Sequence, residues 1–457
     1  MGKLLKAGLA AGGTVAAARL LRRAFRSEPR YAPWEKPPYR DFPNKVLIAG
    51  GGFAGYTVAR DLCELTRDRE DVGVMVISRE NFLTFWPMVP EVIANDIDAQ
   101  NIAQPLRRSL IRAGASFRRA EVESVDFDRR CVRAGGQEFP YDHLVLALGG
   151  QPNFFGIPGV EEHSLTMKGL SDAMRIRNRM IERFEEATLA RGDVPDSRLT
   201  FVIIGGGATG VETAAQLHSL VHHALAPDYP NINPHRVRII LIEAADEILQ
   251  ELDPALRRVA RAKLVERRIE VLTKTAAQEV TGDRVILNNG DVIRSENVIW
   301  TAGGRPNAKL RDLDLPLTKL DGVIVDRYLR VQDRENVWAL GDCAAIPGRD
   351  GKYVPPTAQA ATQEGHVLAR NILAAIDGAG ELEEFEYRPL GQLVELGANF
   401  AVNEVMGVKF SGLLAALFWR AVYLTKLKSP QNRLRVVLDW VLHAFYRPAT
   451  TQIRGLG

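Results

Sequence analysis

The sequence has few cysteines and no long apolar run. Only three cysteines occur in 457 residues, and no CxxC or CxxxxC pair is present. A zinc ribbon or a local redox disulfide is therefore not expected, and the chain should be intracellular or independent of disulfides. No uninterrupted apolar stretch reaches the roughly 18 residues of a membrane-spanning helix. Its 46% apolar and 25% charged residues exclude a wholly disordered or collagen-like chain.

Acidic residues are scarce at the two ends of the chain. The net charge is +3, but residues 1–30 carry +6 and residues 409–457 carry +7, which leaves −10 for residues 31–408. An acidic body with basic, apolar ends indicates attachment to an anionic surface, and a membrane is the first expectation. A nucleic acid is the alternative, but the acidic body and the lack of a recognisable nucleic-acid-binding module argue against it.

Residues 1–43 form a basic, apolar extension with a Pro-rich linker at its end. A stretch of small apolar residues is followed here by several arginines. We expect a short amphipathic or membrane-lying helix. A flexible extension and a secretory signal peptide are the alternatives, and the dense arginine cluster after the apolar stretch argues against the signal.

A strand, a glycine-rich turn and the start of a helix occur twice. The first copy runs from Lys45 to Gly55 and the second from Phe201 to Gly210. Hairpin signals follow the first glycine of each copy after 86 and 85 residues, at Gly135-Gly136 and Asn289-Gly290. Each hairpin leads into an apolar strand that ends in two glycines. The sequence therefore predicts an α/β fold with one Rossmann-like module built twice.

Both copies carry the spacing G-x-G-x-x-G. The first glycine permits a tight turn, the second lets the backbone approach a pyrophosphate, and the third lets the helix pack closely on the strand. Two such modules predict two bound dinucleotides, a flavin and a nicotinamide. The candidate binding residues in these turns and at the glycine-ended strands are Gly50, Gly52, Phe53, Ala54, Gly55, Gly149, Gly205, Gly207, Gly210 and Gly303.

An acidic residue is expected at the end of the strand after each glycine-rich helix, where it holds the ribose hydroxyls. Glu243 occupies this place in the second module. Because a carboxylate there repels a 2′-phosphate and no arginine follows directly, NAD(H) is favoured over NADP(H). In the first module Ser78 departs from the pattern, so either its hydroxyl or Glu80 should hold the ribose hydroxyls.

A third strand ends in Gly341-Asp342, which places a carboxylate where a ribitol hydroxyl could be held; an ordinary turn is the alternative. With this segment the chain resembles the two-dinucleotide-binding flavoproteins, and among them the type II NADH dehydrogenases, from about residue 44 to 447. The motifs that carry the resemblance are Gly205–Glu212, Gly341–Ala344, Pro355–Gly365 and Asn81–Pro90. The resemblance implies FAD in the first module, NADH in the second, and Asp342 on the FAD ribitol.

The resemblance also implies a quinone pocket lined by Ala358, Gln359 and Gln363, whose amides can bond a quinone carbonyl. It further implies that Glu212 lies near the nicotinamide and the flavin and relays a proton to the quinone. From the residues alone, the glutamines are two polar side chains on one helix face, and Glu212 is an acid favoured at a helix N-terminus.

The C-terminal segment contains an amphipathic pattern. Leu434, Leu438, Val441 and Phe445 belong to one apolar stripe, and the apolar stretch 410–424 precedes it. Basic residues and few acids favour helices that lie at a membrane surface; a dimer interface or a core helix is the alternative.

The expected domains are an FAD domain (44–152 and 322–385), an NADH domain (153–321) and a membrane-binding segment (386–457).

The sequence thus predicts a peripheral membrane flavoprotein on the cytoplasmic face that passes electrons from NADH through FAD to a quinone, without ion pumping. A homodimer is left open. The alternatives are a sulfide:quinone oxidoreductase, which needs redox cysteines facing the flavin, another NADH-dependent flavoprotein reductase, or a redox-sensing flavoprotein without turnover. No metal is expected, since no further ligand completes the pair His218 and His222.

Overall fold

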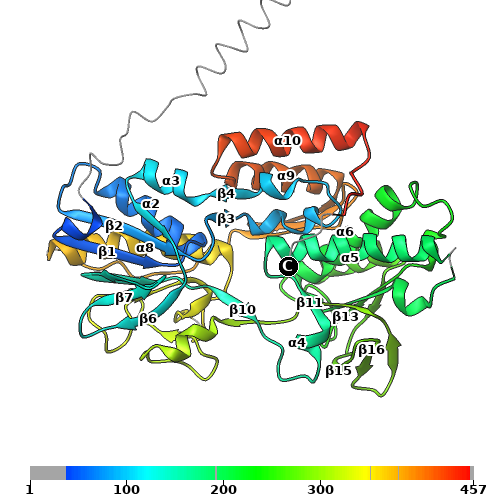
Figure 1. Cartoon of the computed structure of the whole chain (residues 1–457), viewed down its shortest axis with the longest axis horizontal. Helices are drawn as coiled ribbons and strands as arrows, with labels where there is room; N and C mark the ends of the chain where they lie inside the picture. The colour runs from blue at the N-terminus through cyan, green and yellow to red at the C-terminus, as the bar shows by residue number, and fades with distance from the viewer. Residues whose placement is uncertain (1–37, 191–192, 350, 379, 453–457) are drawn as a thin grey trace, which may run out of the picture.

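The computed structural model describes residues 38–190, 193–349, 351–378 and 380–452. The helix expected near the N-terminus lies outside these residues. Two α/β units lie side by side, and the C-terminal helices α9 and α10 form a layer at one edge of the molecule (Figure 1). In the described part of the chain, no helix has both the length and the apolarity needed to cross a bilayer.

The first unit is a parallel five-stranded sheet in the order β21-β9-β1-β2-β5. Four of its strands are largely buried, as apolar strands covered on both faces must be, whereas the edge strand β5 exposes its two arginines. The last strand, β21, comes from a distant part of the chain. The elements are β1 (Asn44–Ala49), α2 (Phe53–Leu65), β2 (Val72–Ser78), β5 (Ser116–Arg119), β9 (His143–Leu146), β21 (Val337–Ala339) and α8 (Ala358–Asp377).

The second unit repeats this arrangement with the order β11-β18-β12-β13-β14, again all parallel. The predicted duplication of one Rossmann-like module is therefore confirmed. Its elements are β11 (Ser164–Thr166), α5 (Leu170–Leu189), β12 (Thr200–Ile204), α6 (Ala208–Ser219), the π-helix η7 (Leu220–Leu225), β13 (Arg238–Ile242), α7 (Pro254–Glu266), β14 (Glu270–Leu272) and β18 (Asn297–Trp300).

Each unit also carries a small antiparallel sheet that contains the predicted hairpin. In the first, Ala134 pairs with Gln137 across Gly135 and Gly136, which have φ of 57° and 71° as a two-residue turn requires. The second hairpin has a longer loop, because Ile286 pairs with Val292. These strands are β6 (Val122–Asp126), β7 (Cys131–Ala134), β8 (Gln137–Pro140), β15 (Ala277–Val280), β16 (Arg284–Leu287) and β17 (Val292–Arg294).

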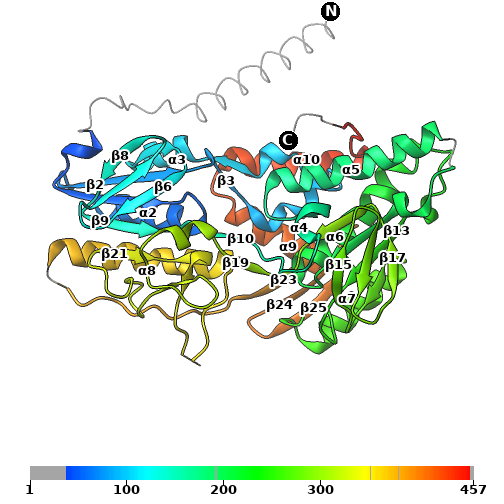
Figure 2. The same cartoon turned by 60° about the horizontal axis from the view of Figure 1, so that its bottom comes forward.

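A two-stranded ribbon crosses between the units. The strands β10 (Gly150–Pro152) and β19 (Gly304–Pro306) pair in antiparallel fashion. Each begins directly at the glycine pair that ends a strand of its own unit, so the ribbon joins the carboxyl edges of the two sheets (Figure 2). These edges are where doubly wound folds bind ligands.

A three-stranded antiparallel sheet and two helices end the chain. The sheet contains β23 (Gly391–Glu395), β24 (Ala401–Val405) and β25 (Val408–Gly412), and the helices are α9 (Leu413–Lys426) and α10 (Pro430–Phe445). The shorter remaining elements are η2 (Tyr39–Asp41), β3 (Phe82–Thr84), η3 (Trp86–Met88), η4 (Pro90–Val92), η5 (Ala99–Asn101), β4 (Ala103–Pro105), α3 (Leu106–Ala113), α4 (Val160–His163), η6 (Asp196–Leu199), η8 (Pro234–Arg236), η9 (Ala308–Asp312), β20 (Val323–Ile324), η10 (Gly341–Cys343) and β22 (Ala344–Ala345).

The helix α10 turns its polar side chains toward the protein and its apolar stripe outward. The Asp439 carboxylate accepts hydrogen bonds from Asn101 Nδ2 (2.6 Å) and the Asp98 N–H (3.1 Å), and Trp440 Nε1 donates to Glu91 (3.1 Å). The exposed large apolar side chains of the two helices are Leu413, Leu414, Leu417, Phe418, Leu434, Leu438, Val441, Leu442 and Phe445. An ordinary core helix, one alternative for this segment, has the reverse orientation.

Candidate functional site

The first glycine of each fingerprint makes a turn that no other residue fits. Gly50 and Gly205 have φ of 124° and 115°. A Cβ on Gly50 would lie 2.0 Å from the Ala147 carbonyl oxygen, and one on Gly205 would lie 2.7 Å from the Ala302 nitrogen. The third glycines are equally constrained, because a Cβ on Gly55 or Gly210 would lie about 2 Å from a turn carbonyl (2.1 and 1.8 Å). These four glycines are explained by packing within the protein.

The middle glycines, Gly52 and Gly207, have no such internal reason. Both have negative φ (−73° and −69°), and a Cβ there would meet no heavy atom within 4 Å. Each is the N-cap of a long helix and supplies no side-chain cap, so the first N–H groups of α2 and α6 face open space. This cradle fits a pyrophosphate, which is bound by backbone N–H groups at a helix N-terminus. The structure therefore fits a dinucleotide in each unit.

The strand-end residues lie against the glycine-rich turns. The Glu243 carboxylate accepts hydrogen bonds from the N–H groups of Gly206 (2.6 Å) and Ala245 (2.8 Å), which hold it beside the turn. Ser78 occupies the equivalent place in the first unit, where its Oγ lies 2.9 Å from an ideal Cβ on Gly51. Glu80 is two residues farther on, half exposed, and pairs with Arg79 at 3.8 Å. Ser78 is therefore the structural counterpart of Glu243.

Asp342 follows the carboxyl end of β21, beside the ribbon. A Cβ on Gly150 would lie 3.3 Å from Asp342 Oδ2. Burial raises the pKa of Asp342, and Lys168 opposes the shift. The sequence interpretation missed Glu364, which is 2% exposed and accepts a hydrogen bond from the Gly341 N–H (2.6 Å). An acidic residue in the apolar face of α8 could have indicated this role in the sequence. Through its bond to Gly341, Glu364 fixes the turn that presents Asp342.

The residues expected at the quinone pocket lie at the start of α8. Ala358 is its first residue, and both glutamines bond the main chain of the segment that leads to β23. Gln359 Oε1 accepts from the Leu390 N–H (2.8 Å) and the Tyr387 hydroxyl (3.1 Å), while Gln363 exchanges bonds with the N–H and carbonyl of Arg388 (3.1 and 2.8 Å). The two amides therefore tie α8 to the C-terminal sheet, and a ligand carbonyl would compete with these bonds.

Glu212 lies in the first turns of α6 and is 9% exposed. Burial raises the pKa of its carboxyl well above the ordinary value, with a further contribution from Glu395 and a partly opposing hydrogen bond from the Glu395 N–H (3.1 Å). Burial thus favours the protonated form of this carboxyl, which is the form that can act as an acid. Glu395, on β23, was not singled out from the sequence, because its partner lies 183 residues away.

The cysteines of the described residues form no disulfide, and the histidines there belong to no cluster that could hold a metal. No group of three or more His, Cys, Asp or Glu with metal-binding geometry was found there. All three cysteines are buried. Cys343 contacts the carbonyls of Leu340 (3.2 Å) and Leu146 (3.4 Å), and burial raises its pKa to about 12. A thiol with that pKa is not the reactive thiolate that a sulfide oxidoreductase needs.

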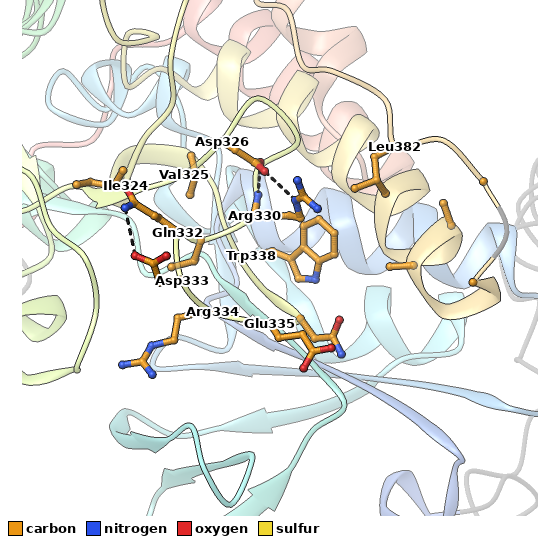
Figure 3. A pocket seen from close by; sticks show the side chains of 16 residues that line it. Ile324, Val325, Asp326, Arg330, Gln332, Asp333, Arg334, Glu335, Trp338 and Leu382 are labelled. Atoms are coloured by element: carbon orange, nitrogen blue, oxygen red, sulfur yellow. Dashed lines mark hydrogen bonds and ion pairs between the residues drawn. The ribbon is translucent and has the colours of Figure 1, made fainter.

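A hollow of about 660 Å³ lies away from both glycine-rich turns. Its wall includes Val331–Asn336, which directly precede β21, whereas Gly341 and Asp342 follow the other end of that strand. Figure 3 shows Arg330 there paired with Asp326. Because doubly wound folds bind ligands at the carboxyl ends of their strands, this hollow is not a dinucleotide site.

Comparison with known proteins agrees with this geometry. The model of the pyridine nucleotide-disulphide oxidoreductases matches residues 44–365, and the model of the NDH2 C-terminal domain matches residues 390–447. The solved structure of NDH2 from Plasmodium falciparum in complex with NADH superposes with a TM-score of 0.83 at 19% identity, covering 90% of this chain and 100% of that chain.

Two curated relatives match over nearly their whole length. A probable NADH dehydrogenase of Dictyostelium discoideum is 31% identical over 408 residues, which cover 87% of this chain and 88% of that protein. The type II NADH:quinone oxidoreductase Ndh of Mycobacterium tuberculosis is 30% identical over 432 residues, which cover 91% and 90%. The chain belongs to the pyridine nucleotide-disulphide oxidoreductases and, within them, to the type II NADH dehydrogenases.

Proposed function

We propose that this protein is an NADH:quinone oxidoreductase that works without ion pumping. FAD binds the first unit, NADH binds the second, and a quinone is the electron acceptor. The observation that carries the proposal is the open helix N-terminus at Gly52 and again at Gly207. No side chain of the protein caps either N-terminus, so each unit offers a cradle for a dinucleotide. The named relatives, which include NADH dehydrogenases and NADH:quinone oxidoreductases, support the same reaction.

The residues of this chain bind and orient the reactants. Gly50, Gly52, Phe53, Ala54, Gly55 and Gly149, with Ser78, Gly341 and Asp342, would hold FAD. Gly205, Gly207, Gly210, Gly303 and Glu243 would hold NADH. Bound FAD supplies the capacity to accept a hydride and to release its electrons singly or in pairs. The ribbon β10–β19 brings the two cradles to one central edge, which lets the two rings meet.

The proposed acceptor site involves Ala358, Gln359 and Gln363 at the start of α8. Glu212 supplies a proton to the quinone, and its burial supports this role because burial raises the pKa of the carboxyl and so favours the form that can donate a proton. We propose the domains 44–152 with 322–385 for FAD, 153–321 for NADH, and 386–457 for the membrane. Glu80, exposed and paired with Arg79, is the weaker candidate for the FAD ribose.

We further propose that α9 and α10 bind a membrane on its cytoplasmic face. Nine exposed apolar side chains on these two helices support this, because an apolar face of this size on a monomer marks an interaction surface. A lipid-soluble quinone requires an enzyme that reaches the bilayer. A homodimer formed through the same face is the alternative.

The test is an anaerobic mixing experiment. NADH is expected to bleach the absorbance of the oxidised flavin, and a short-chain quinone added afterwards is expected to restore it. Absence of bleaching by NADH would overturn the proposal. Bleaching by sulfide instead would point to a sulfide:quinone oxidoreductase, and a flavin that neither donor reduces would point to a redox sensor.

Glu243 is expected to set the preference for NADH. Replacing it in Glu243→Ser copies Ser78 of the first unit, removes the negative charge and leaves a neutral hydroxyl in place of the carboxylate acceptor. Loss of one charge-assisted hydrogen bond costs about 1.5–3 kcal/mol, so the KM for NADH should rise roughly tenfold or more, while the KM for NADPH should fall. Steady-state assays with both nucleotides measure this. Glu270→Ser, at an exposed position in the same unit, should change neither KM. An unchanged ratio of the KM for NADPH to the KM for NADH in Glu243→Ser would contradict the assignment.

A further inference from the structure

The buried helix α6 carries a polar stripe. Glu212, Gln216 and Ser219 are spaced four and three residues apart, so they lie on one face, and their exposed fractions are only 9%, 0% and 4%. A helix inside a core is normally apolar on every face, because burying polar groups costs free energy unless they are paired. The stripe spans about 10 Å at the rise of an α-helix.

Strand β23 faces this stripe with one carboxylate. The Glu395 N–H donates to Glu212 Oε1 at 3.1 Å, and Gln216 Nε2 donates to Glu395 Oε2 at 2.8 Å. Glu395 is itself 5% exposed. Glu212 thus bonds the main chain of Glu395, and Gln216, one turn farther along α6, bonds the Glu395 carboxylate.

Beyond Glu395 the polar contacts continue to a hollow. Arg267 Nη2 donates to the Gly397 carbonyl at 2.8 Å, and an ideal Cβ on Gly397 would lie 2.7 Å from Ser219 Oγ and 3.2 Å from Arg267 Nη1. Arg267 and His218 line a hollow of about 450 Å³, which exposed residues of the second unit also line. We call this line of groups, from Glu212 through Glu395 to Arg267 and His218, the polar seam.

The polar seam contains four buried polar atoms that have no hydrogen-bond partner among the described residues. They are Gln216 Oε1, Ser219 Oγ, Arg267 Nη1 and His218 Nδ1. Buried polar groups of this kind are normally satisfied by ordered water. Gln216 bonds Glu395, Ser219 and Arg267 both lie at Gly397, and Arg267 and His218 line the hollow. Water molecules on these four atoms would therefore form a short chain between Glu395 and the hollow, and such a chain conducts protons.

The charges around Glu395 suit exchange of a proton near neutral pH. The charged and titratable groups that face it are Glu212 on α6, Glu91 and Asp96 of the first unit, Arg267 after α7 and Arg420 on α9. Burial raises the pKa of Glu395 to about 7; Asp96 adds to the shift, and the Gly397 N–H and the two arginines oppose it.

We propose that Glu395 resupplies Glu212 with protons from solvent through the polar seam. The overall reaction NADH + H⁺ + quinone → NAD⁺ + quinol takes one proton from solvent. Glu212 gives this proton to a quinone oxygen, the Glu395 carboxyl gives its proton to the Glu212 carboxylate, and Glu395 is reprotonated from the hollow. This inference rests on the proposed function and adds the route by which the proton arrives.

The test compares the two half-reactions in Glu395→Gln and in the wild type across pH 6 to 8.5. The amide side chain in Glu395→Gln cannot relay a proton, so the rate at which Glu212 receives protons should depend directly on the proton concentration of the solvent. The quinone half-reaction should slow roughly tenfold at pH 8 and less than twofold at pH 6, with a larger solvent isotope effect. Flavin reduction by NADH should stay within about twofold of the wild type, because hydride transfer needs no proton from Glu212. Glu395→Asp, which keeps a carboxyl, should restore most of the rate.

Glu404→Gln is the matched control. Glu404 lies on the neighbouring strand β24 and accepts a hydrogen bond from the Asp253 N–H, outside the polar seam. This variant should keep the wild-type pH profile. A uniform loss at every pH in Glu395→Gln, or an equal loss in the NADH half-reaction, would show a structural role and overturn the relay. If the wild type itself fails either half-reaction, the proposed function fails. If the wild type performs both and Glu395→Gln matches it, only the relay fails.

Discussion

Replacing Gly207 with leucine is expected to abolish NADH-dependent flavin reduction while the protein stays folded and keeps its FAD. The backbone at Gly207 is extended, and a Cβ there meets no protein atom within 4 Å, so the side chain costs the fold little. It would fill the cradle at the N-terminus of α6 instead. We expect a loss in apparent NADH affinity of at least about a hundredfold, or ~2.7 kcal/mol. Stopped-flow flavin absorbance and NADH titration measure this.

The same substitution in the first unit serves as the control. Gly52→Leu should fold equally well and lose FAD instead, which the flavin content of the purified protein reports. Gly210→Leu should differ from both, because a Cβ there would lie 1.8 Å from the Gly205 carbonyl oxygen and the helix would be displaced from its strand. Normal NADH affinity in Gly207→Leu would show that the open cradle is not the nucleotide site.

The double variant Leu414→Glu/Leu438→Glu is expected to release the protein from membranes. These leucines are 75% and 49% exposed on α9 and α10. Two leucines transferred into a bilayer contribute about 3 kcal/mol, so the partition coefficient should fall roughly a hundredfold. Co-sedimentation with anionic vesicles measures binding. Turnover with a long-chain quinone in vesicles should fall in parallel, whereas turnover with a short-chain quinone in solution should not change.

Two leucines outside α9 and α10 that are at least as exposed provide the control. Leu189→Glu/Leu320→Glu changes side chains that are 85% and 75% exposed, with the same gain of negative charge. This variant should bind vesicles nearly as well as the wild type. If the helices instead form a dimer interface, the wild type will sediment as a dimer without vesicles and Leu414→Glu/Leu438→Glu as a monomer, which would contradict the membrane assignment.

The pattern of α10 illustrates how far the sequence alone could go. The spacing of its leucines predicted a helix with an apolar stripe, and the helix is confirmed. The same spacing would suit a core helix with the stripe facing inward. Asp439 and Trp440, which bond Asn101 and Glu91 of the first unit, decide the orientation, and these contacts join residues more than 300 positions apart.

The two dinucleotide modules, their glycine-rich turns and the strand-end Glu243 could all be predicted from the sequence. These features depend on local backbone geometry, in which a turn, a helix start and a strand end follow one another within a few residues. Three other features follow from the folded arrangement alone. Gly52 and Gly207 face open space while Gly55 and Gly210 do not, Glu364 fixes the turn before Asp342, and Glu395 contacts Glu212. Burial and long-range pairing create those properties, since a carboxyl acquires its raised pKa and its partners only after distant strands and helices have enclosed it.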